Sequence, residues 1–296
     1  MSGTMKLAFG SLAIGIVVLG LKALAWWITG SVALLSDALE STVNVATALA
    51  ALFAIHVAER PADAQHPYGH HKAELFSAVL EGVLIILAAL LILRESYHGL
   101  MDPRVLDQPF EGLVLNGAAT AVNALWCYVL ISRGRRLKSP ALVADGHHLL
   151  ADVVTSLGVA VGIILALATG WWILDPALAA LVAVNILWSG WKVIATSLSS
   201  LLDEAVPDAT LALIRETISS EAAGALEAHD LRTRQAGRMT FIDFHLIVPG
   251  EMTVQEAHRV CDQVEGALRV AVPDVSVTIH VEPEHKAKHS GIVVVD

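Results

Sequence analysis

The stretch "LLSDALESTVNV", residues 34–45, lies inside an apolar run at 32–57 that is long enough to cross a lipid bilayer as a helix. Asp37, Glu40 and Asn44 interrupt this run, although hydrocarbon strongly disfavours polar side chains. Their spacing of three and then four residues places them on one face of a helix. The stretch therefore predicts a membrane helix with a polar stripe. Whether this stripe is structural or functional depends on the other segments of the chain.

Six segments of the chain are apolar enough and long enough to span a bilayer, at roughly 7–29, 32–57, 74–98, 111–132, 142–169 and 172–199. Hydrophobic residues make up 55% of the 296 residues, and the mean hydropathy is +0.63. The sequence therefore predicts an α-helical membrane protein with six transmembrane helices over residues 1–203.

The connection "SRGRRLKSP", residues 132–140, carries four basic residues between the fourth and fifth predicted spans. Basic loops favour the cytoplasmic side of a membrane, and an even number of spans then places both termini in the cytoplasm. The first apolar segment leads directly into further ones, so we expect no cleavable signal peptide.

The pattern changes after Pro207. Residues 201–296 hold 16 of the 29 acidic residues, and periodicity predicts the order helix, strand, strand, helix, strand. We expect a small cytoplasmic α+β domain of metallochaperone-like αββαβ order with a three-stranded sheet over 204–284, and a flexible tail over 285–296. The net charge of −10 argues against a nucleic-acid partner.

The fifth predicted span repeats the polar spacing of the second. In "ADGHHLLADVV", residues 144–154, Asp145, His148 and Asp152 share one helix face. Two membrane helices with matching polar stripes can shield each other from lipid, and intramembrane ionisable groups are usually functional.

Four side chains of these two helices form a candidate metal site: Glu40, Asn44, His148 and Asp152. Two carboxylates, an imidazole and a carboxamide oxygen suit a divalent ion such as Zn²⁺, and the two negative charges would neutralise it. Asp37 and Asp145 would line the path by which the ion enters from the cytoplasm. The alternative is a structural polar cluster that joins two helices.

Five longer strings carry a family resemblance: "AWWITGSVALLSDALES", "RPADAQHPYGHHKAE", "VADGHHLLADVVTS", "SLLDEAVPD" and "AHDLRTRQAG". In them the chain resembles the cation diffusion facilitators, especially the YiiP-like bacterial zinc and iron efflux branch. The resemblance implies a homodimer in the bacterial inner membrane that exports divalent metal ions in exchange for protons. It also implies a transport site between the second and fifth spans.

The same resemblance implies further sites. Asp63, His66 and His70 would form a second metal site in a loop, for which a solvated histidine-rich loop is the alternative. Lys72 and Asp203 would form a charge pair near the dimer interface. The metal ligands implied for the cytoplasmic domain are His229, His245, His258, His280 and Glu282.

The chain departs from the family pattern at the transport site. Relatives usually carry two Asp, or His and Asp, where this chain has Glu40 and Asn44, so we expect an altered metal preference. Two other functions remain open. One is a membrane metal sensor or assembly scaffold that binds without transport, and the other is a proton/alkali-cation antiporter or channel, against which His148 argues because alkali ions prefer oxygen ligands.

Overall fold

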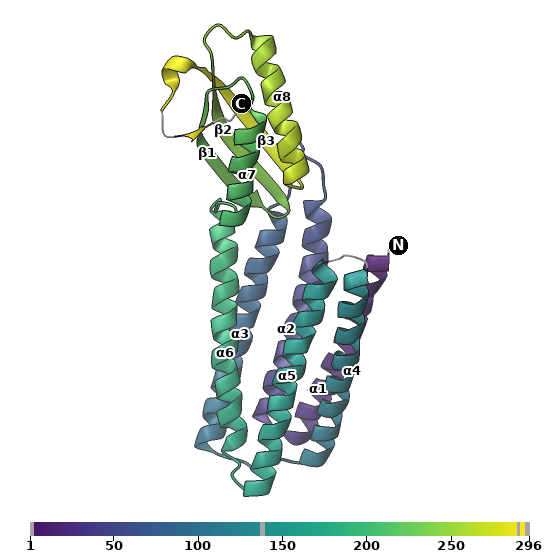
Figure 1. Cartoon of the computed structure of the whole chain (residues 1–296). Coiled ribbons are helices and arrows are strands. Elements are labelled where there is room, and N and C mark those ends of the chain that lie inside the picture. Colours follow the sequence, from purple (N-terminus) through teal and green to yellow (C-terminus); the bar gives the residue numbers. More distant parts are fainter. Residues whose placement is uncertain (1–2, 137–139, 289–290, 294–296) are drawn as a thin grey trace. The chain divides into compact units, whose positions relative to one another are not determined.

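The computed structural model describes residues 3–136, 140–288 and 291–293 (Figure 1). The chain divides into two units. One comprises residues 1–53 and 77–194, and the other comprises residues 54–76 and 195–296. Lys138, one of the four basic residues expected at the cytoplasmic side, lies outside the described residues.

Six long helices confirm the predicted membrane domain, and all six are apolar and long enough to cross a bilayer. They are α1 (Gly3–Thr29), α2 (Val32–Ala58), α3 (Ala73–Met101), α4 (Pro109–Arg136), α5 (Pro140–Thr169) and α6 (Leu174–Leu201). Gly30 and Gly170 have φ angles of 64° and 69°, a left-handed conformation that glycine adopts without steric penalty. They allow the tight turns of the helical hairpins α1–α2 and α5–α6.

Small side chains allow the membrane helices to approach each other closely. A Cβ atom on Gly82 of α3 would lie 3.1 Å from the carbonyl oxygen of Gly190 on α6. Close approach of this kind is typical of membrane helices, where packing replaces the hydrophobic effect as the attractive force. A buried apolar cluster includes Ala25, Ala89, Ile92, Ile163 and Ala183 from four helices.

A buried carboxylate fixes the beginning of α2. Asp175, in the first turn of α6, accepts hydrogen bonds from the Ser31 hydroxyl (2.5 Å) and the Val32 backbone N–H (2.7 Å). The first N–H groups of a helix have no partner within the helix, and a carboxylate there also interacts favourably with the helix dipole. This contact ties the hairpin α1–α2 to α6.

The second unit contains the predicted αββαβ domain. Its elements are α7 (Asp208–Glu221), β1 (Glu227–Ala236), β2 (Met239–Val248), α8 (Val254–Ala271) and β3 (Val275–Pro283). Strands β1 and β2 form an antiparallel hairpin, and β3 lies parallel to β2. Helices α7 and α8 pack against the sheet around Ile218, Ile242, Phe244, Val264 and Leu268 (Figure 1). Thr253 and Glu256 form a capping box that begins α8.

The sheet has one more strand than the sequence predicts. After β3, a 3-10 turn η1 (Glu284–Lys286) leads to β4 (Ile292–Val293), which pairs with β1 at Ala228 and Glu227. The strand order is therefore β3-β2-β1-β4. This strand comes from the segment expected to be a flexible tail, and its pairing with a distant strand could not be predicted from local sequence.

Candidate functional site

The intramembrane candidate site lies where α2 and α5 exchange a hydrogen bond. The Asn44 side-chain amide donates to a carboxylate oxygen of Asp152 over 2.9 Å. Asp152 is buried, with 3% of its surface exposed, and Asn44 is half-buried. The structure thus brings together one predicted ligand from each of the two helices.

The other two predicted ligands lie one helical turn away from this contact. Glu40 precedes Asn44 on α2, is half-buried and lies within electrostatic range of Asp152. His148 precedes Asp152 on α5, lies within electrostatic range of it and has an exposed side chain. The arrangement therefore offers two carboxylates, a carboxamide and an imidazole along one α2–α5 contact.

Asp37 does not line an open surface. Its carboxylate accepts a 2.6 Å hydrogen bond from the Lys22 ammonium and 2.9 Å hydrogen bonds from the Ser156 hydroxyl. The side chains of Lys22 and Asp37 are each 1% exposed. The Lys22–Asp37–Ser156 group therefore joins α1, α2 and α5, and the role of Asp37 on the path of the ion stays a prediction.

Lys22 was not among the residues singled out from the sequence, although a signal for it exists. Residues 22 and 37 lie almost symmetrically about the tight turn at 29–31, so an α1–α2 hairpin brings them to the same depth. A lysine inside an apolar span also requires a partner, because an unpaired charge in hydrocarbon is costly.

Asp145, the second residue predicted on the path of the ion, is half-buried at the α1–α5 contact. It accepts a 2.7 Å hydrogen bond from the Ser11 hydroxyl, which in turn accepts one from the Trp126 indole at 2.9 Å. Asp145 therefore belongs to a chain of hydrogen bonds across α5, α1 and α4.

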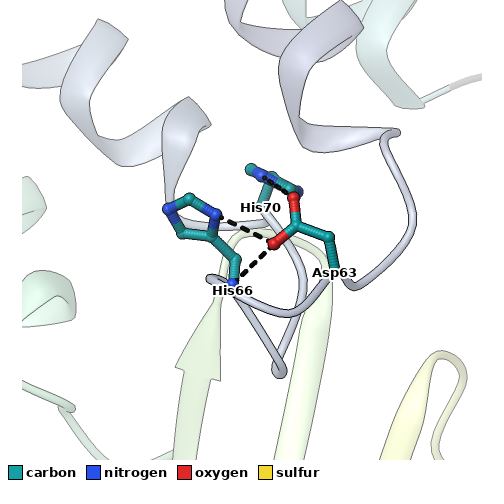
Figure 2. Close-up of side chains that lie close together, drawn as sticks. All are labelled: Asp63, His66 and His70. Atoms are coloured by element: carbon teal, nitrogen blue, oxygen red, sulfur yellow. Dashed lines mark hydrogen bonds and ion pairs between the residues drawn. The ribbon is translucent and has the colours of Figure 1, made fainter.

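The structure brings the three predicted loop ligands together (Figure 2). Asp63 lies 3.3 Å from Nδ1 of His66 and 3.5 Å from Nε2 of His70. One ligand atom from each residue lies within 4.8 Å of the others, a separation that a bound metal ion could bridge. The backbone N–H groups of His66 and Gln65 donate to Asp63, and the His66 bond in particular lowers the pKa of its carboxyl group. Asp63 is therefore an ionised acceptor at neutral pH.

Aromatic and cationic contacts fasten this loop within its unit. The Arg234 guanidinium lies over the ring of Phe241, 4.1 Å from its centroid, and 5.4 Å from that of Tyr68. Lys72 forms the expected pair with Asp203 at 2.9 Å, and Arg234 lies 3.6 Å from the same carboxylate. The hydrogen bond from Lys72 lowers the pKa of Asp203. Sequence reasoning missed Arg234, although it lies within the quoted string "AHDLRTRQAG".

Three predicted ligands of the cytoplasmic domain form one row across the sheet. His229 on β1 pairs with His245 on β2, which pairs with His280 on β3. Glu282 lies beside this row, with its carboxylate 3.4 Å from His229, 3.3 Å from His245 and 3.7 Å from His280. The strand register therefore brings residues that are far apart in sequence together in one candidate metal site.

Asp230 joins this row, and His258 does not. A bulge in β1 between His229 and Arg232, with a φ angle of 52° at Asp230, turns the Asp230 carboxylate to within 3.9 Å of His245. The Lys288 ammonium contacts the same carboxylate at 2.6 and 2.7 Å and lowers its pKa. His258 lies on α8, is largely exposed and contacts Asp262 at 3.7 Å. A role for His258 at a dimer contact stays a prediction.

Two family models match the chain. Residues 8–202 match the cation efflux transmembrane domain, and residues 206–284 match the cytoplasmic domain of cation efflux proteins. An uncharacterized transporter of Synechocystis, sll1263, is 45% identical over 273 residues, which cover 92% of this chain and 88% of the relative. The cation-efflux pump FieF of Salmonella paratyphi A is 34% identical over 286 residues, which cover 94% of this chain and 92% of the pump. Among solved structures, CzrB in its Zn form is 48% identical, covering 29% of this chain and 98% of that chain with a TM-score of 0.27.

Proposed function

The chain belongs to the cation efflux family, also called cation diffusion facilitators, and we propose that it exports divalent transition-metal ions, Zn²⁺ first among them, in exchange for protons. It is a multi-pass membrane transporter with a cytoplasmic carboxy-terminal domain, and not an enzyme. We also propose that the protein lies in the bacterial inner membrane.

The observation that carries the proposal is the contact between Asn44 and Asp152. It supports a transport site between α2 and α5, with Glu40 and His148 one turn away on the same two helices. The two carboxylates would neutralise a divalent ion, which lowers the penalty of holding that ion inside a membrane. A site with imidazole, carboxylate and carboxamide ligands suits Zn²⁺ and its neighbours better than alkali ions.

Proton coupling follows from the chemistry of these ligands. A metal ion binds to neutral imidazole and ionised carboxylate, so protons and metal compete for His148 and Asp152. Protons that reach the site from the outer side displace the ion there, and their loss to the cytoplasm restores the empty site. An inward proton gradient would thereby drive outward metal transport.

The cytoplasmic domain supports a homodimer that metal ions regulate. The Glu282 carboxylate lies within 3.7 Å of three imidazoles, those of His229, His245 and His280. A metal ion bound there would also reduce the repulsion between two acidic domains of a dimer.

A flux assay with the purified protein in liposomes tests the proposal. Metal uptake is measured for Zn²⁺, Cd²⁺, Fe²⁺, Co²⁺, Mn²⁺ and Na⁺, with a pH gradient imposed or removed. We expect Zn²⁺ flux that depends on the gradient and that Asp152→Ala or His148→Ala abolishes. Thr42→Ala, on the exposed side of α2, is the matched control and should retain flux. Zn²⁺ binding without flux would favour the sensor or scaffold, and Na⁺ flux would favour the alkali-cation antiporter or channel.

A further inference from the structure

A buried positive charge lies beside the candidate transport site. Lys22 and Asp37 are joined at 2.6 Å, and their side chains are each 1% exposed. The Ser156 hydroxyl, one turn after Asp152 on α5, contacts both oxygens of the Asp37 carboxylate at 2.9 Å. The pair is therefore enclosed between α1, α2 and α5 rather than placed at a helix end, where a lysine could reach water.

The charges of this pair act on the transport site. Glu40 and Asp152 each lie within electrostatic range of both Lys22 and Asp37. Charge interactions in a protein interior are much stronger than in water, so a single unmatched charge at this range changes the affinity for an ion.

The number of charges indicates what Lys22 does. Asp37, Glu40 and Asp152 carry three negative charges when all are ionised, and the Lys22 ammonium reduces the total to two. A divalent cation carries two positive charges, so the occupied site would be electrically neutral. Without Lys22, the same ion would leave one buried carboxylate unmatched.

We propose that Lys22 sets the net charge of the transport site: it neutralises Asp37, so that the α2–α5 site presents two net negative charges to a divalent cation. This inference rests on the proposed function. It gives Asp37 a charge-balancing role in addition to the role on the path of the ion that the sequence suggests. A helix contact alone would not need ionised groups, because burying a charge pair costs more solvation free energy than burying a neutral contact.

The test measures the KM for Zn²⁺ in liposome flux with the full-length protein and three variants. Asp37→Asn leaves the Lys22 charge unmatched and should raise KM about tenfold or more, because the net charge of the site falls to one negative. The double variant Lys22→Met with Asp37→Asn returns the net charge to two negative and should recover most of this loss. Lys22→Met alone makes the net charge three negative, which attracts a cation at least as strongly as two, so its KM should be no higher than that of the wild type. Lys192→Met, an exposed lysine on α6, is the control for the substitution itself.

The outcomes separate this inference from the proposed function. A wild-type protein that carries no divalent metal would overturn both. A wild type with normal flux, together with an unchanged KM in Asp37→Asn, would overturn only the charge-matching role. A double variant whose KM is no lower than that of Asp37→Asn would also overturn the charge-matching role. A raised KM in Lys22→Met would do the same, because a purely structural pair would weaken transport whichever partner is removed. Size-exclusion profiles of each variant check that the protein assembles.

Discussion

The side-chain amide of Asn44 donates a 2.9 Å hydrogen bond to Asp152 and thereby joins α2 to α5 at the candidate transport site. Asn44 is a neutral residue at a position where the resemblance to the cation diffusion facilitators implies an acid. As a ligand, the carboxamide would supply an oxygen without a charge, so the proposed site would hold its ion less strongly than a site with a further carboxylate. A site with lower affinity can release its ion more readily, and faster release can raise the rate of transport.

Substitution of Asn44 by Asp should tighten Zn²⁺ binding and slow its release. Two carboxylates within hydrogen-bond distance repel each other unless a metal ion or a proton lies between them, so we expect KM to fall about tenfold and the maximal rate to fall with it. Liposome flux for Zn²⁺ and Mn²⁺ measures both quantities. Thr42→Ala serves as the control, and an Asn44→Asp variant with wild-type KM and rate would show that Asn44 is not a ligand.

Metal binding at the loop site, measured from about pH 7.5 to 5.5, should weaken with falling pH, because protons and a metal ion compete for the imidazole nitrogens of His66 and His70. Backbone hydrogen bonds hold the pKa of Asp63 below its usual range, so its carboxylate stays ionised over this interval and takes up no proton there. Protonation of His66 and His70 removes their lone pairs from the metal.

Zinc titrations of the full-length protein at several pH values measure this dependence. The difference between the wild type and the variant His66→Gln with His70→Gln isolates the loop site, and His71→Gln is the control because His71 is not part of the three-residue group. If the difference between the two proteins does not change with pH, the loop does not bind zinc through these imidazoles.

Local sequence was enough to predict most of the fold. The six spans depend on apolar length, and the αββαβ order depends on periodicity, and both are properties of neighbouring residues. The candidate loop ligands Asp63, His66 and His70 are also close in sequence, so their proximity follows from one turn of chain.

Contacts between distant residues were harder to predict. The near-symmetry of residues 22 and 37 about the turn at 29–31 indicates their common depth, but whether the two side chains face each other depends on how α1 and α2 pack. The carboxylate of Asp230 is positioned by a bulge that no residue pattern indicates. Lys288 reaches that carboxylate from the segment between β3 and β4. Strand β4 itself pairs with β1 across more than fifty residues of chain. Arg234 lay within a motif that was recognised as a whole, without its role in the loop contacts.

Removal of the Arg234 guanidinium should loosen the loop that carries Asp63. Its stacking on Phe241 and Tyr68 and its contact with Asp203 are each partly exposed, so we expect Arg234→Ala to lower stability by about 1–2 kcal/mol. Thermal unfolding and limited proteolysis at residues 59–72 measure the effect. Arg232→Ala, an exposed arginine on the same strand, is the matched control. Equal stability and equal proteolysis in the two variants would contradict the role of Arg234.

The Lys72–Asp203 pair should stabilise the protein at neutral pH and lose this effect in acid. Its hydrogen bond lowers the pKa of Asp203 in the folded state, so the contribution is complete above the unfolded value of about 4 and disappears as the pH falls through the lower, folded value. Both side chains are more than a third exposed, so the effect is at most about 1 kcal/mol. We expect Asp203→Asn to unfold at a lower temperature than the wild type at pH 7, and we expect this difference to shrink as the pH falls below about 4. A constant difference over this range would indicate that Asp203 acts through packing rather than charge.

Substitution of Lys288 by Met should raise the affinity of the cytoplasmic domain for zinc. The Lys288 ammonium contacts both oxygens of Asp230 at 2.6 and 2.7 Å, so the lysine and a metal ion compete for one carboxylate. The loss of Lys288 also lets the pKa of Asp230 rise toward its usual value of about 4, but the carboxylate stays ionised at pH 7 and remains a ligand. We expect zinc to bind several times more tightly, as measured by competition with a chelator in full-length protein that also carries His66→Gln, His70→Gln and Asp152→Ala. Lys286→Met, an exposed lysine two residues earlier, should bind zinc as the same background does. Equal affinities in the Lys286 and Lys288 variants would mean that Asp230 does not ligate the ion.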